Sequence, residues 1–106
     1  SDEIAANVDR QAQAIRDGLD AINREFDLFD EVRGRGLMLG AVLKPAYAGR
    51  AGEILDHAAG NGLLLLQAGP DVLRFVPALN VSDEDVSEGL LRLRSALGTF
   101  LAASKP

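Results

Sequence analysis

Two stretches of this chain are continuously apolar, and they limit the folds open to it. Residues Leu37 to Leu43 are all apolar apart from Gly40, and Leu63 to Leu66 is a run of four leucines. Strands that bury one face alternate apolar and polar residues, whereas unbroken apolar runs are typical of strands covered on both faces. The sequence therefore predicts a sheet that needs cover on each side.

Two long amphipathic helices are predicted to provide part of that cover. Apolar residues recur every three or four positions over residues 4–26 and again over residues 86–100, which places each set on one side of a helix. Ser82 with Asp85 resembles the capping pattern that begins a helix. Gly18 lies inside the first pattern and makes it a weak point, because glycine costs about 1 kcal/mol against alanine in a helix.

The middle of the chain is predicted to hold the strands and a short helix. Two short strands or one bent strand fit residues 32–43, and the apolar spacing of residues 54–59 predicts a short helix. Residues 63–66 and 72–76 flank the turn sequence AGPD at residues 68–71, so they are expected to form a hairpin.

Together these elements predict an α/β (α+β) two-layer sandwich. It has a mainly antiparallel sheet of about four strands, helices on one face, and the order α-β-β-α-β-β-α. Three helices in 106 residues cover one face, so the other face requires a further domain or chain. Helices split between both faces are the alternative. Residues 1–30 are predicted as a long helix leading into the domain, and residues 31–106 as the domain itself, within a single-domain fragment of a larger enzyme.

Composition argues against several classes of function. The net charge is −5, whereas binding to a phosphate backbone needs a basic face, so we expect no nucleic-acid partner. No apolar run approaches the ~20 residues of a bilayer span, and no signal segment opens the chain, so we expect no membrane role. The sequence has no cysteine, which excludes thiol catalysis and is compatible with the cytoplasm, where we expect this protein.

Few side chains are candidates for catalysis or metal binding. His57 is the only histidine, and with Glu53 it is expected to lie on a solvated helix face and not in a metal site. Neither lysine, Lys44 beside Pro45 or Lys105 near the C-terminus, is predicted to be a buried nucleophile. We therefore expect no catalytic residue, no metal ligand and no cofactor-binding residue in this chain.

Arg74 is the candidate for ligand binding. It interrupts an otherwise apolar strand and is predicted to share a face with Val72 and Val76, opposite Leu73 and Phe75. The guanidinium fork matches a carboxylate, so a substrate carboxylate or an acidic side chain of a neighbouring domain would satisfy it. An edge-strand arginine in water, or a salt bridge within the domain, is the alternative.

The segments around this arginine resemble a known enzyme family. They read VRGRGLMLG at residues 32–40, QAGPDVLRFVPAL at residues 67–79 and NVSDEDVSEGL at residues 80–90. With them, residues 31–97 are similar to the C-terminal small domain of class III pyridoxal-phosphate aminotransferases, in the acetylornithine/succinylornithine branch.

The resemblance implies a small domain packed against a large, missing pyridoxal-phosphate domain in a homodimer. It implies a transaminase that moves the amino group of N-acetylornithine, or N-succinylornithine, to 2-oxoglutarate in arginine metabolism. Pyridoxal phosphate is expected in the complete enzyme and not in this chain, whose 106 residues alone are expected to be inactive. Arg74 matches the arginine of the family's Arg-Phe-x-Pro motif, which implies that it faces the active-site cleft and receives a carboxylate of the amino-acid or oxo-acid substrate, or pairs with an acid that guards the site.

Two other classes of function suit the same layout. One is a stand-alone regulatory module that binds an amino acid, which would bind ornithine or arginine tightly by itself. The other is a structural dimerisation domain, which would form a stable dimer without responding to a ligand.

Overall fold

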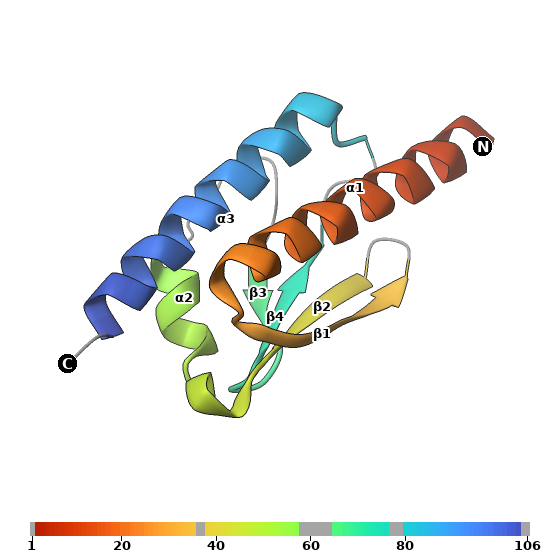
Figure 1. Ribbon diagram of the computed structural model, residues 1–106. Helices are drawn as coiled ribbons and strands as arrows, with labels where there is room; N and C mark the ends of the chain where they lie inside the picture. Colours follow the sequence, from red (N-terminus) through yellow and green to blue (C-terminus); the bar gives the residue numbers. More distant parts are fainter. Residues whose placement is uncertain (1, 36–37, 58–64, 77–79, 105–106) are drawn as a thin grey trace.

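The described part of the chain, residues 2–35, 38–57, 65–76 and 80–104, forms three α-helices on one face of a four-stranded sheet in a computed structural model (Figure 1). The elements in chain order are α1 (Asp2–Phe26), β1 (Phe29–Arg35), β2 (Met38–Leu43), the 3-10 turn η1 (Pro45–Tyr47), α2 (Ala51–His57), β3 (Leu65–Gln67), β4 (Val72–Phe75) and α3 (Asp83–Ser104). The predicted order α-β-β-α-β-β-α and the two-layer α+β class are confirmed, and η1 is an addition.

The sheet joins strands that lie far apart in the sequence. Its order is β1-β2-β4-β3 with all neighbours antiparallel, so β2 pairs with β1 and, across the segment that contains α2, with β4. Ala41 of β2 lies opposite Val32 on one side and Leu73 on the other. The predicted hairpin is confirmed by β3 and β4, while residues 58–59 of the predicted helix and 63–64 of the leucine run lie outside the described residues.

The helices cover the sheet with the apolar side that their spacing predicts. The core is filled by Ile15, Leu19 and Ile22 of α1, Leu93, Leu97 and Phe100 of α3, and Leu39, Leu73 and Phe75 of the sheet. The first turns of α1 extend beyond this core, where Ile4 is exposed (Figure 1). No helix in the described ranges is long and apolar enough to cross a membrane.

Gly18 allows the two long helices to approach each other closely. A Cβ atom at this position would lie 2.9 Å from Cδ2 of Leu90 in α3, well inside ordinary van der Waals contact. Helix α1 is continuous from Asp2 to Phe26, so the glycine that marked a weak point in the sequence serves helix packing instead.

Side-chain caps determine where strand β1 and helix α3 begin. Asn23 accepts hydrogen bonds from the N–H groups of Leu28 and Phe29, both at 2.8 Å, and donates one to the Phe29 carbonyl at 2.9 Å. At the start of α3 the Ser82 hydroxyl accepts a hydrogen bond from the N–H of Asp85 at 3.1 Å, which confirms the predicted cap.

The second face of the sheet carries no helix from the described residues (Figure 1). Met38 is 53% exposed there and Leu66 is 43% exposed, although both belong to the apolar runs that predicted cover on each side. The one-sided arrangement is therefore confirmed, and the alternative with helices on both faces is wrong. We call the outward side chains of Met38, Leu66, Val72 and Arg74 the open face of the sheet.

Gly34→Ala is expected to lower the free energy of unfolding by roughly 3 kcal/mol or more. Gly34 has a φ of +101°, and an added Cβ would collide with the backbone carbonyl oxygen of Met38, which cannot retreat without opening the β1–β2 pair.

Gly49→Ala is the matched control for denaturant unfolding. Gly49 also has a positive φ, +79°, but a Cβ there would meet nothing within 4 Å. The Gly49→Ala substitution should therefore lower the free energy of unfolding only by the left-handed backbone strain, about 1–2 kcal/mol. Equal losses of unfolding free energy in Gly34→Ala and Gly49→Ala would contradict this account of the β1–β2 pair.

Candidate functional site

Arg74 projects from the open face, as the alternation of β4 predicts. Its strand neighbours Leu73 and Phe75 are fully buried beneath the helices, whereas Arg74 is exposed. Val72 and Val76 are half-buried on the same side as Arg74. Because β4 lies between β2 and β3, the alternative of an arginine on an edge strand is wrong.

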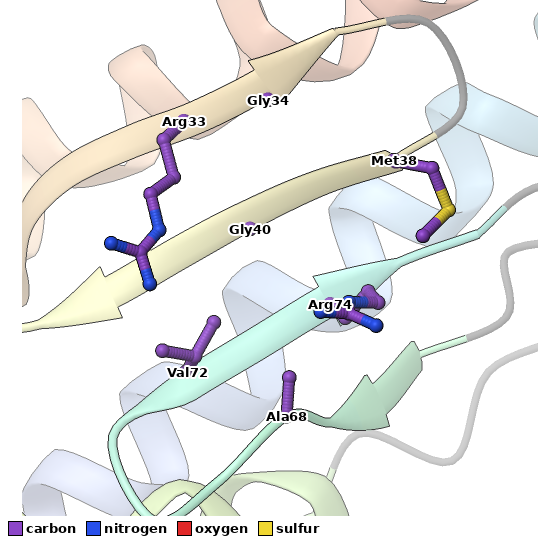
Figure 2. Close-up of a pocket in the computed structure, with 7 residues that line it drawn as sticks. All are labelled: Arg33, Gly34, Met38, Gly40, Ala68, Val72 and Arg74. Carbon is purple, nitrogen blue, oxygen red and sulfur yellow. The ribbon is translucent and has the colours of Figure 1, made fainter.

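A hollow of about 310 Å³ lies beside Arg74 on this face (Figure 2). It is lined by Arg33 and Gly34 of β1, Met38 and Gly40 of β2, Ala68, and Val72 and Arg74 of β4. The arginines carry positive charge, and the other lining residues are glycine or apolar. Such a lining suits a small ligand with anionic ends and an apolar body.

Gly40 keeps the middle of the hollow open. In the sheet register Gly40 lies opposite Arg33 of β1 and opposite Arg74 of β4. A Cβ atom at Gly40 would lie 3.3 Å from Cγ1 of Val72 and would stand between the two arginines. The lack of a side chain at Gly40 thus keeps this space open, whereas Gly34 is required for its positive φ of 101°.

Other arginines of the chain are held by carboxylates. Arg94 of α3 donates two hydrogen bonds to Glu25 of α1, at 2.7 and 2.8 Å, and Arg50 donates two to Glu53, at 3.2 and 2.6 Å. These hydrogen bonds raise the pKa of Arg94 and of Arg50 above its usual value. Within the described ranges Arg74 has no side-chain hydrogen bond or ion pair, so its donors are available to a ligand.

Sequence reasoning predicts Arg74 as a site residue and misses Arg33. The structure brings these two residues to one hollow through Gly40, their common neighbour in the register. In the β1–β2 half of this register Arg35 pairs with Met38, which places Arg33 opposite Gly40, whereas the sequence left open whether residues 32–43 form two strands or one bent strand. The β2–β4 half is a long-range pairing with no local signal.

Lys44, the one lysine within the described ranges, does not suit the attachment of pyridoxal phosphate. Lys44 donates a hydrogen bond to Asp27 at 2.5 Å, and this bond, with the charge of Asp27, raises the pKa of Lys44. A lysine that bonds to a carbonyl group needs an amine that is easily deprotonated, which the ion pair opposes. Lys105 lies outside the described residues.

The predicted His57–Glu53 helix face is only partly described. Glu53 is exposed and accepts hydrogen bonds from Arg50, while the side chain of His57, the last residue of α2, lies outside the described part. Among the described side chains, no group of three or more His, Asp or Glu residues could hold a metal ion.

Comparison with known proteins identifies the family. Residues 1–97 match the family Aminotransferase class-III. The chain belongs to the class-III aminotransferases. This class-III chain is 64% identical over 102 residues to the acetylornithine aminotransferase of Xanthomonas campestris pv. campestris, a match that covers 96% of the chain and 25% of that protein. It is 47% identical over 104 residues to the acetylornithine aminotransferase of Neisseria meningitidis serogroup A, covering 98% of the chain and 26% of the relative.

A solved structure agrees with this class-III fold. The crystal structure of N-acetylornithine aminotransferase from Stenotrophomonas maltophilia K279a matches with a TM-score of 0.92 and 70% sequence identity. The match covers 97% of this chain and 28% of that one. The class-III resemblance inferred from the sequence is confirmed, and the chain spans about a quarter of the length of the relatives it matches.

Proposed function

We propose that this class-III chain is the C-terminal small domain of a pyridoxal-phosphate-dependent aminotransferase. The reaction transfers the amino group of N-acetylornithine to 2-oxoglutarate, in arginine metabolism, and N-succinylornithine is the alternative donor. Two similarities support the choice of donor, because the relatives at 64% and 70% identity are named acetylornithine and N-acetylornithine aminotransferases. The quarter-length coverage favours part of an enzyme over a stand-alone regulatory module or dimerisation domain.

The observation that carries the proposal is the position of Arg74. The side chain leaves the central part of the sheet on its open face, beside a hollow and without an acidic partner in the described ranges. A guanidinium binds a carboxylate through two parallel hydrogen bonds, which fixes the direction of the bound molecule as well as its distance. Arg74 therefore receives a carboxylate of the amino-acid or oxo-acid substrate and orients its reacting end.

The remaining parts of the enzyme belong to the same proposal. A large domain outside this chain holds pyridoxal phosphate, which supplies the electron sink for amino transfer when bound. The open face lies against that domain, two copies form a homodimer, and the enzyme works in the cytoplasm. Residues 1–30 form the leading helix and residues 31–106 the small domain, and these 106 residues alone are inactive.

Arg74→Lys in the complete enzyme is expected to raise the KM for carboxylate substrates about tenfold or more. Lysine keeps the charge but loses the planar fork, and hydrogen bonds to charged groups contribute about 1.5–3 kcal/mol. Steady-state kinetics measure the change, and the visible absorbance of the bound cofactor should persist because Arg74 does not hold it.

Arg92→Lys provides the control for this experiment. Arg92 lies on α3 and donates a hydrogen bond to Glu88 at 2.8 Å, on an exposed helix surface. Its substitution should leave the KM within about twofold of the original value. Unchanged kinetics in Arg74→Lys would remove Arg74 from the substrate site.

A further inference from the structure

We propose that Arg16 of helix α1 is a positioning residue: it holds the wall that strand β1 contributes to the hollow, and so supports substrate binding without touching the substrate. Arg16 is not among the residues that line the hollow. The inference rests on the proposed function, in which the hollow beside Arg74 receives the substrate, and adds to it a residue of the helix layer.

Arg16 bonds to the outer edge of strand β1. Its guanidinium donates hydrogen bonds to the carbonyl oxygens of Val32 and Gly34, at 2.9 and 2.6 Å. In the described sheet β1 is an edge strand with β2 as its one neighbour, so the polar groups of its other edge have no strand to pair with. Carbonyl groups two residues apart point to the same edge, and the guanidinium has enough N–H groups to meet both. Arg16 thus takes the place of a neighbouring strand at these two residues.

The same face of α1 also holds the start of β1. Asn23, seven residues after Arg16, bonds to the backbone there at distances of 2.8 to 2.9 Å. Seven residues make about two helical turns, which puts both side chains on one face of α1, about 10 Å apart along its axis. Val32 and Gly34 lie three and five residues after Phe29, about 10–17 Å along the strand. Helix and strand therefore run alongside each other in opposite directions, joined at both ends of their contact (Figure 1).

One of the two residues that Arg16 bonds is itself part of the hollow. Gly34 lines it from β1, next to Met38 of β2 (Figure 2). A glycine backbone adopts many conformations, so the sequence alone does not fix the direction of its carbonyl group. The hydrogen bond from Arg16 fixes that direction while Gly34 keeps its φ of +101°. Loss of this bond would let the β1 wall move, whereas Arg74 would stay in place because β4 is paired on both sides.

The inference is tested in the complete, cofactor-loaded enzyme by comparing Arg16→Gln with Arg24→Gln, the same substitution at an exposed position of the same helix. We expect Arg16→Gln to raise the KM for N-acetylornithine about threefold or more and to leave kcat within about twofold. The reason is that a displaced wall weakens the binding of substrate and transition state alike. Arg16→Lys still reaches one carbonyl oxygen and should recover part of the loss. Arg24→Gln should change neither constant.

Hydrogen–deuterium exchange of the same variants reports on β1 independently of activity. In Arg16→Gln, peptides that cover residues 29–43 should exchange about threefold or more faster than in the original enzyme. Peptides that cover residues 65–76 should exchange at the original rate, because the β3–β4 pair does not depend on Arg16.

An unchanged KM in Arg16→Gln would overturn the inference, even with faster exchange of β1, because Arg16 would then stabilise the strand without affecting the hollow. A fall in kcat at constant KM, or faster exchange throughout the chain, would overturn it as well.

Failure of this inference is distinguishable from failure of the proposed function. If Arg74→Lys leaves the KM unchanged, the proposed function fails. If Arg74→Lys raises the KM and Arg16→Gln does not, only the positioning role of Arg16 fails.

Discussion

Burial of Leu73 and Phe75 beneath the helices forces Arg74, the residue between them, onto the opposite face of the sheet. Successive side chains of a strand point to opposite faces, so the position of the arginine follows directly from the packing of its neighbours. The helices all pack on one side, which leaves the other side with a mixture of apolar residues and arginines. The candidate site is thus a consequence of one-sided core packing.

The open face combines exposed apolar side chains with the hollow beside Arg74. Met38 and Leu66 present apolar surface to water. A domain packed on this face would bury that surface, which stabilises the packed state by about 25 cal/mol per Å². Arg74 projects beside the hollow on the same face, where its exposed guanidinium could bind an anionic group. Gly40 lies opposite Arg74 in the register, and because it has no side chain the sheet surface is hollowed at this position.

Local sequence patterns predict most of the fold, and long-range strand pairing accounts for what they miss. Helical spacing predicts α1 and α3 together with their buried sides, and the turn before Val72 predicts the β3–β4 hairpin. The alternation of β4 is enough to place Arg74 on the outward face. The relation of Arg33 to Arg74 depends on β2 pairing with β4 across the segment that holds α2, and a single sequence carries no signal for that pairing. Gly18 shows the same limit: its helix propensity predicts weakness, whereas its contact with Leu90 depends on tertiary packing.

The central claim is that the open face lies against the remainder of a longer enzyme, and hydroxyl-radical footprinting of the complete protein tests it most directly. Met38 and Leu66, which are 53% and 43% exposed in this chain, should be oxidised several-fold more slowly than their exposure here implies. Leu91 of α3, 61% exposed and on the helix layer away from that face, serves as the reference and should react freely. Oxidation of Met38 and Leu66 in proportion to their exposure here would show that the open face is bare in the complete protein, and would contradict the account.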